Sequence, residues 1–476
     1  MAPVDIKNRK WVSFILVATG IFMSTLDSSI VNIALPVIME NLNAPFETVQ
    51  WIVVIYLLTI SSTLLAFGRL SDIKGRRWVY CYGFVWFTLG SLLCGTAGQA
   101  SYLILSRAFQ GIGAAMIMAC SPALVVDAFP LKERGKALGL VGTVVATGLT
   151  AGPAFGGLIL QHFSWRMIFF LNVPIGAVAV VAAWKILKGT AAESASHEPF
   201  DWPGAVFLAA ALFSVLTLML HVDKWSIASY RMIVLTLVAV AMSVLFVRAE
   251  LKTDYPIVDT HLLQNRFFMV SVICAVILFA GLFTITFLMP FYLMRPAGLS
   301  AQTAGTVMMI PFGFLFFLSP LSGWITDRVG SRALCFAGMG GLTAALFSFT
   351  TLVPSAGLFP EIWRLGLAGV GVALFLPAYS ASAMSVISIR KRGIASGTIA
   401  AARNFGMVIG VALSGLIFSH TYTRLSGGLN ANVYEPTLQP VFMNAFHSAM
   451  LAGAVLVAAG WILTLFRGRG DALDVQ

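Results

Sequence analysis

Long apolar runs, separated by short polar or charged segments, follow one another along the whole chain. A helix needs about 20 mainly apolar residues to cross the hydrocarbon core of a bilayer. Runs of about this length lie near residues 12–38, 48–68, 78–98, 102–126, 137–160, 166–187, 203–221, 231–248, 267–293, 303–325, 333–353, 361–388, 394–418 and 445–466. The first run is too long for the apolar core of a signal peptide. The pattern therefore predicts an all-α membrane protein with fourteen transmembrane helices.

The composition favours the same class of protein. Hydrophobic residues make up 59% of the 476 residues and charged residues 10%, whereas soluble domains carry about 25% charged residues. The net charge of +11 comes from short basic clusters between apolar runs, without the interleaved aromatic residues of a nucleic-acid surface. We therefore expect a lipid bilayer as the partner and no nucleic acid. The five cysteines lack the spacing of a metal site or a disulfide framework, so no metal or cofactor is expected.

The basic residues are distributed unevenly between the two sides of the predicted membrane. When the N-terminus is placed inside, 22 of the 30 Lys and Arg residues fall on the inner segments. Cytoplasmic segments of membrane proteins carry such an excess of positive charge. The asymmetry predicts that both termini are cytoplasmic.

The two ends of the chain repeat each other weakly at an offset of about 255 to 258 residues. Four segments recur in register: Gly68–Asp72, Gly111–Ala115, Arg134–Gly139 and Gly152–Gly157 match Gly323–Asp327, Gly369–Ala373, Arg392–Gly397 and Gly410–Gly415. Parallel halves of this kind are typical of transporters, with the substrate site between the halves near the membrane midplane. We predict two six-helix bundles, residues 1–190 and 266–476, joined by a linker with two additional transmembrane helices at 191–265.

Two charged residues lie at positions where a transmembrane helix rarely carries a charge. Asp27 is the one carboxylate deep inside a predicted span, and Arg107 lies about six residues inside another. Burial disfavours the ionised form of a carboxyl group, so Asp27 can bind and release a proton as its access to solvent changes. Arg107 is its natural electrostatic partner. The alternative is a structural role for each residue, with Asp27 as a hydrogen-bond partner of Asn32 or of a neighbouring helix.

Two glycine-containing segments stand out beside these charges. Gly68–Arg77 lies between the second and third spans, and Asp127 at the inner end of the fourth span is the expected partner of Arg76. Gly148–Gly157, in the fifth span, combines glycines that permit close helix packing with Pro153, which bends a helix. The alternatives are an ordinary cytoplasmic loop and an ordinary glycine packing face.

These motifs, taken in order along nearly the whole chain, resemble those of the major facilitator superfamily. With Leu26–Pro36 they are similar to its fourteen-helix drug:proton antiporter subfamily, the EmrB/QacA-like multidrug exporters. The resemblance implies proton coupling by Asp27 and Arg107. We interpret Trp165–Gly176 as a family marker and an interfacial anchor. The resemblance also implies a conformational latch formed by Gly68, Asp72, Gly75, Arg76, Asp127 and Asp327, and an antiporter motif formed by Gly148, Gly152, Pro153, Gly156 and Gly157.

The predicted substrate site is wide and mostly apolar, with aromatic rings that can stack on lipophilic cations. Its candidate residues are Asp27, Asn32, Tyr56, Phe287, Phe291, Tyr379, Arg403 and Asn404. Some relatives carry extra carboxylates in the thirteenth span, where this chain has Arg403 and Asn404, and this departure puts dicationic substrates in doubt. Arg403 suits an anionic or zwitterionic amphiphile, or else it bonds to backbone carbonyls at a broken helix.

The combined features predict a proton-coupled antiporter of the bacterial inner membrane that exports lipophilic, often cationic drugs, dyes or biocides by alternating access. Its expected partners are the bilayer, protons and small lipophilic substrates, and some such exporters also work with a periplasmic adaptor and an outer-membrane channel. The alternative is an exporter or flippase of an endogenous amphiphile, such as a lipid, a fatty acid or a siderophore. An enzyme is not expected, because the six His residues are scattered along the chain.

Overall fold

The structure, a computed structural model, describes residues 6–130, 133–187, 201–221, 229–253, 265–354, 357–385 and 392–466. Every regular element within these ranges is a helix. Thirteen helical stretches in the described ranges are long and apolar enough to cross a membrane, and Trp202–Val215 is a shorter apolar helical stretch. The predicted all-α membrane fold is therefore confirmed, with helical structure in each of the predicted apolar runs.

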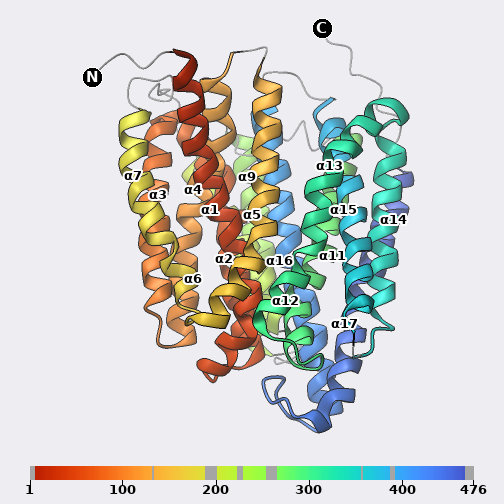
Figure 1. The fold of residues 1–476 in the computed structure, drawn as a ribbon. Coiled ribbons are helices and arrows are strands. Elements are labelled where there is room, and N and C mark those ends of the chain that lie inside the picture. The colour runs from red at the N-terminus through yellow and green to blue at the C-terminus, as the bar shows by residue number, and fades with distance from the viewer. Residues whose placement is uncertain are drawn as a thin grey trace.

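The helices follow one another in the order of the apolar runs (Figure 1). The first set comprises α1 Ile6–Asn41, α2 Phe46–Lys74, α3 Arg76–Gly95, α4 Ala100–Ala128, α5 Arg134–His162, α6 Met167–Phe170 and α7 Asn172–Ile186. The next two are α8 Trp202–His221 and α9 Tyr230–Lys252. The last set comprises α11 Arg266–Met294, α12 Ala301–Met308, α13 Ile310–Val329, α14 Ser331–Phe349, α15 Phe359–Ser385, α16 Arg392–Leu425, the short 3₁₀ helix η4 Pro436–Leu438 and α17 Gln439–Leu465.

Several helices are longer than the apolar runs from which they were predicted. The helix predicted at 394–418 extends as α16 to Leu425, and the one predicted from 445 begins as α17 at Gln439. Hydropathy marks only the part of a helix inside the hydrocarbon, whereas backbone hydrogen bonding continues through the polar residues beyond it. Two runs are also divided, the sixth into α6 and α7 and the tenth into α12 and α13.

The helices pack in two groups that meet along one boundary, called the seam here. In the first group α1 packs along α4 and α5, and α3 packs along α4; in the second α11 packs along α16 and α17, and α14 along α15. Figure 1 shows the first group, red to yellow, beside the second, green to blue. Across the seam α2 packs on α16, and α5 on α12 and α13. The additional helix α8 contacts both α2 and α16, so the α8–α9 pair lies beside the seam.

Aromatic rings close part of the seam at the face of the molecule opposite the start of α1. Phe46, at the first turn of α2, lies with its ring centroid 5.0 Å from those of Phe291 and Phe418 and 5.6 Å from that of Phe287. All four side chains are buried. Phe287 and Phe291 therefore pack between the two helix groups at this face.

Polar contacts join the same part of the seam. The amide nitrogen of Gln50 donates hydrogen bonds to the carbonyl oxygens of Val411, at 2.7 Å, and Ala412, at 3.2 Å. One turn earlier on α2, Glu47 accepts a hydrogen bond of 2.5 Å from Ser419. The α2–α16 contact is thus fixed by side-chain amide and carboxylate groups as well as by rings.

We predict that Gln50→Leu, which keeps a similar volume, weakens the α2–α16 contact. Both hydrogen bonds across the seam are lost, and each contributes about 0.5–1.5 kcal/mol. The thermal unfolding midpoint of the purified protein in detergent should therefore fall. Gln161→Leu, at an exposed position near the end of α5, is the control and should leave the midpoint unchanged. Equal midpoints for Gln50→Leu and the wild type would contradict the prediction.

Candidate transport site

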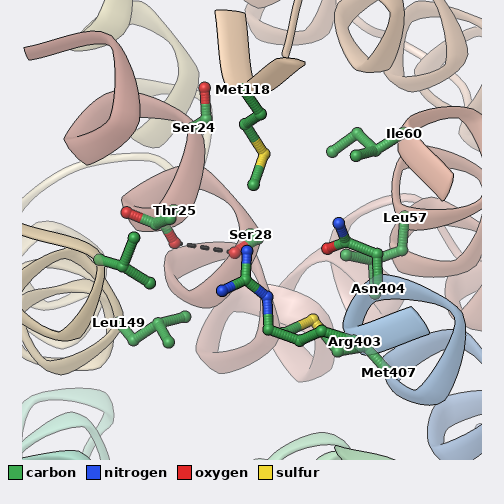
Figure 2. A pocket seen from close by; sticks show the side chains of 11 residues that line it. Ser24, Thr25, Ser28, Leu57, Ile60, Met118, Leu149, Arg403, Asn404 and Met407 are labelled. Atoms are coloured by element: carbon green, nitrogen blue, oxygen red, sulfur yellow. Dashed lines mark hydrogen bonds between the residues drawn. The ribbon is translucent and has the colours of Figure 1, made fainter. Parts of the chain in front are cut away.

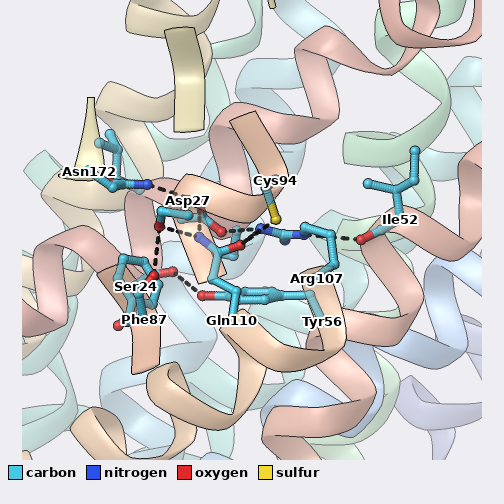
Figure 3. Close-up of polar contacts among 12 residues, drawn as sticks. Ser24, Asp27, Ile52, Tyr56, Phe87, Cys94, Arg107, Gln110 and Asn172 are labelled. Atoms are coloured by element: carbon cyan, nitrogen blue, oxygen red, sulfur yellow. Dashed lines mark hydrogen bonds and ion pairs between the residues drawn. The ribbon is translucent and has the colours of Figure 1, made fainter. Parts of the chain in front are cut away.

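A buried carboxylate on α1 forms the centre of a polar network inside the first helix group (Figure 3). Asp27 forms an ion pair with Arg107 of α4, and the exposed fraction of each side chain is at most 1%. The other oxygen of Asp27 accepts hydrogen bonds from the amide nitrogens of Gln110, at 2.9 Å, and Asn172, at 3.1 Å. The carboxylate therefore has donors on both oxygens, supplied by α4 and α7.

The guanidinium group of Arg107 is surrounded as completely as the carboxylate. Its Nη1 also donates to the side-chain oxygen of Gln110 at 2.7 Å, and its Nε donates to the carbonyl oxygen of Ile52 at 3.2 Å. The ring of Tyr56 lies 3.8 Å from the guanidinium carbon, within the range of a cation–π contact. Tyr56 in turn donates from its hydroxyl to the carbonyl oxygen of Ser24 at 3.1 Å.

The network explains how a charged pair is tolerated inside membrane helices. Removing two charges from water costs several kcal/mol per ion unless the pair has good geometry and further hydrogen bonds. Both groups have such bonds here, so each charge is stabilised by fixed dipoles from α2, α4 and α7. Sequence reasoning identified the two charges but not Gln110 and Asn172. Gln110 lies three residues after Arg107, on the same face of α4, and this spacing was the available signal.

The segment Trp165–Gly176, which supplies Asn172, was interpreted as an interfacial anchor, and the structure differs from this interpretation. Trp165 is buried, with the guanidinium of Arg166 4.4 Å above its ring. The interpretation is therefore wrong for Trp165. It relied on the preference of tryptophan for membrane surfaces, whereas here tertiary packing covers the ring.

A pocket lies at the seam, along a face of α1 that does not include Asp27. Its lining comes from α1, α2, α4 and α5 in the first group and from α16 in the second (Figure 2). The described lining residues are Ser24, Thr25, Ser28, Leu57, Ile60, Met118, Val145, Leu149, Arg403, Asn404 and Met407. Figure 2 shows the side chain of Arg403 extending from α16 toward Thr25 and Ser28. Arg403 is the one charged residue among these lining residues.

The residues predicted for substrate binding are separated by the structure. Arg403 and Asn404 line the pocket, whereas Asp27 and Tyr56 belong to the buried network. Asn32 donates to the carbonyl oxygen of Ser28 in its own helix at 3.1 Å and does not bond to Asp27 in the described structure. Phe287 and Phe291 pack against Phe46 at the seam, and Tyr379 stacks on Phe375 with ring centroids 5.4 Å apart.

The residues predicted for a latch meet at the end of the first group where α1 begins. Arg76 donates from Nη1 to Asp127 at 2.6 Å and from Nη2 to Asp72 at 3.0 Å, so that α2, α3 and α4 are tied together. Gly75 makes the sharp turn between α2 and α3 at a φ of 93°, a conformation that favours glycine. A Cβ on Gly68 would meet no atom within 4 Å. The side chain of Asp327 lies outside the described part of the structure.

The glycines of the predicted antiporter motif place α5 between α1 and the second helix group. Gly148, Gly152 and Gly156 face α1, where a side chain would meet Thr25, Ser29 or Ile33 respectively. Gly157 faces α12, and a Cβ there would lie 2.5 Å from the carbonyl oxygen of Ala301. The helix continues through Pro153. Small residues are therefore required on two sides of α5.

Comparisons with known proteins agree with this architecture. The family model of the Major Facilitator Superfamily matches residues 17–411 and 272–471. The riboflavin transporter RibZ of Clostridioides difficile is 34% identical over 416 residues, covering 87% of this chain and 90% of that protein. The multidrug resistance protein Stp of Mycobacterium tuberculosis is 31% identical over 452 residues, covering 93% and 81%.

Among solved structures, a bacterial homologue of the human lysosomal transporter Spinster shares the fold. Its TM-score is 0.69 at 14% sequence identity, over 95% of this chain and 96% of that chain. Together with the membrane-spanning helices, the family match and the relatives named as transporters or resistance proteins define a multi-span transporter of the cell membrane and not an enzyme. The chain belongs to the Major Facilitator Superfamily. Its resemblance to the drug-exporter subfamily is also confirmed by relatives named as resistance and export proteins.

We predict that Gly152→Ala disrupts the contact between α5 and α1. The new Cβ would overlap Ser29 and lie 2.9 Å from the backbone nitrogen of Ile30, so one of the two helices must shift. A lower thermal midpoint and a lower transport rate should result. Gly139→Ala, also on α5 but with no atom within 4 Å of the new Cβ, is the control. Its midpoint should stay equal or rise, because alanine favours a helix by up to about 1 kcal/mol.

We further predict that the two charges at the network centre depend on each other. Arg107→Leu leaves a buried carboxylate without its ion pair, which costs about 3–5 kcal/mol of unfolding free energy. In an Asp27→Asn background the same change should cost much less, because the remaining amide carries no charge. Unfolding in mixed micelles by denaturing detergent measures this double-mutant cycle. Equal costs in the two backgrounds would show that the pair is not coupled.

Proposed function

We propose that this protein is a proton-coupled antiporter that exports small lipophilic compounds by alternating access, with both termini in the cytoplasm. One observation carries the proposal: α1 presents a buried carboxylate on one face and part of the pocket lining on another. Asp27 enters the network with α4 and α7, whereas Ser24, Thr25 and Ser28 line the pocket. Successive residues of a helix are rotated by about 100° about its axis, so neighbouring residues of α1 can face different sites. One rigid helix therefore connects the Asp27 network with the pocket.

Proton binding to Asp27 would change the position of α1. The neutral carboxyl group no longer attracts Arg107 as an ion, while Arg107 keeps Gln110 and the carbonyl oxygen of Ile52 as acceptors. After protonation, the polar contact that Asp27 makes between α1 and α4 would be weaker than the one that Arg107 makes between α4 and α2. A movement of α1 would alter the pocket lining at Thr25 and Ser28, which links protonation to the affinity for cargo.

Alternating access requires the seam to open first at one face and then at the other. We propose that the six-helix bundles 1–190 and 266–476 rock about the pocket. The ring and amide contacts of Phe46 and Gln50 support closure at the face opposite the start of α1. With the basic segments placed in the cytoplasm, as proposed, the closed face is the outer one and the pocket would open toward the cytoplasm. The Asp72–Arg76–Asp127 cluster would act as the latch in the opposite state.

The relatives support two classes of cargo. Stp and several other relatives are named for multidrug or antibiotic resistance, which supports export of drugs. RibZ is named as a riboflavin transporter, which supports an endogenous compound with polar groups as the second candidate. Arg403 in the pocket lining favours this second class, because a guanidinium repels a cationic drug.

Transport by purified protein in proteoliposomes tests the proton coupling. With rhodamine B as the probe, an imposed pH gradient should drive dye accumulation by the wild type. Asp27→Asn preserves the shape of the side chain but binds no proton, so the gradient-driven component should fall at least about tenfold. Binding of the dye without a gradient should persist.

The matched control for this experiment is Glu435→Gln, which removes an exposed carboxylate in the segment before η4. It should leave gradient-driven transport at the wild-type level. If Asp27→Asn also responds fully to the gradient, Asp27 is not the proton carrier.

A further inference from the structure

Arg403 differs from the other arginine in the middle of a transmembrane helix. Arg107 has an ion pair, hydrogen bonds and a stacked ring. For Arg403, by contrast, the described structure contains no ion pair, and its buried Nε has no hydrogen-bond partner. Its side chain extends into the seam pocket (Figure 2). Neither the family relationship nor the coupling mechanism proposed above uses this charge.

An uncompensated charge inside a membrane bundle is costly and points to a function. No carboxylate is present among the described residues that line the pocket. Asp27 cannot serve as the missing partner, because its oxygens are held by Arg107, Gln110 and Asn172, and it does not line the pocket in the described structure. The charge of Arg403 is therefore left for water or for a bound molecule.

The hydroxyl groups opposite Arg403 add a second polar feature. Ser24, Thr25 and Ser28 each donate their own proton to a carbonyl oxygen of α1, at 2.8 to 2.9 Å. Each hydroxyl oxygen then has lone pairs available as acceptors for the O–H or N–H groups of a ligand. Apart from Asn404, the rest of the lining is apolar, with Leu57 and Met118 as examples.

We propose that the seam pocket binds an amphiphile with an anionic oxygen group, a carboxylate above all, and that Arg403 is its counter-ion. The apolar body of the ligand packs on the leucine, isoleucine and methionine side chains of α2, α4 and α16. Hydroxyl or amide donors next to the anionic group bond to the α1 hydroxyls. This inference rests on the proposed function in one respect only: the seam pocket is where the cargo binds.

A pair of dyes that differ by one carboxylate tests the assignment. Rhodamine B carries a free carboxylate, and its ethyl ester has the same xanthene core without it. Equilibrium binding to the purified full-length protein, measured by fluorescence polarisation without a pH gradient, gives the preference between the two. The wild type should favour rhodamine B by about tenfold or more, because a desolvated charge pair contributes at least this much.

The variants distinguish recognition by charge from a change of shape. Arg403→Gln should bring the preference close to one, Arg403→Lys should keep part of it, and Arg403→Glu should favour the ester. Arg328→Gln, which removes an exposed arginine stacked on Trp324, is the control and should behave as the wild type. An unchanged preference in Arg403→Gln, or no preference in the wild type, would overturn the proposal.

The readout is independent of proton coupling. Binding without a gradient should keep its preference in Asp27→Asn even though gradient-driven transport is lost. If Asp27→Asn transports normally while Arg403→Gln loses the dye preference, the coupling proposal fails and the assignment of the pocket stands. The reverse pattern rejects the pocket assignment alone.

Discussion

The buried ion pair between Asp27 and Arg107 constrains how the helices of the first group can be arranged. A carboxylate and a guanidinium can be held away from water only if further groups solvate them. The structure supplies those groups from separate helices: the carbonyl of Ile52 from α2, the amide of Gln110 from α4 and the amide of Asn172 from α7. A shift of one helix by a single turn would remove a donor or an acceptor, so the pair specifies the register of the bundle.

The packing of α5 depends on the same helix that carries the carboxylate. Glycines bring α5 close to α1 at Thr25 and Ser29, two residues before and two residues after Asp27 in the sequence, and close to α12 at Gly157. Ser29 also donates to the carbonyl oxygen of Gly148 at 3.3 Å. A movement of α1 would therefore affect α5, and on the proposed mechanism α5 would transmit it to the second helix group. The glycine motif therefore has a specific physical role, the close packing of α5 on both α1 and α12, which the glycine content of the segment does not describe by itself.

Sequence patterns predicted the helices well, because each span must hold about 20 apolar residues. The pairing of Asp27 with Arg107 was also predictable, since a charge inside a span requires a partner. Gln110 and Asn172 were not found, because a neutral amide changes the hydropathy of a span only slightly. Phe287 and Phe291 were placed in the cavity, whereas they pack across the seam. α11 is apolar on every side and buried over most of its length, so no periodicity distinguishes a side that faces a cavity from a side that packs on other helices.

The positions of the two intramembrane arginines bear on how protons and cargo are exchanged. In a simple exchanger the proton and the cargo compete for one carboxylate, and the cargo must therefore be cationic. Here the carboxylate lies within the first helix group, while the charged residue of the pocket lining belongs to α16 of the second. On the proposed assignments, a proton and a cargo molecule could then occupy the protein together without sharing an atom. Coupling on the proposed mechanism must therefore pass through the position of α1, whose Ser28 lies opposite Arg403 and whose Asp27 meets α4, rather than through direct displacement.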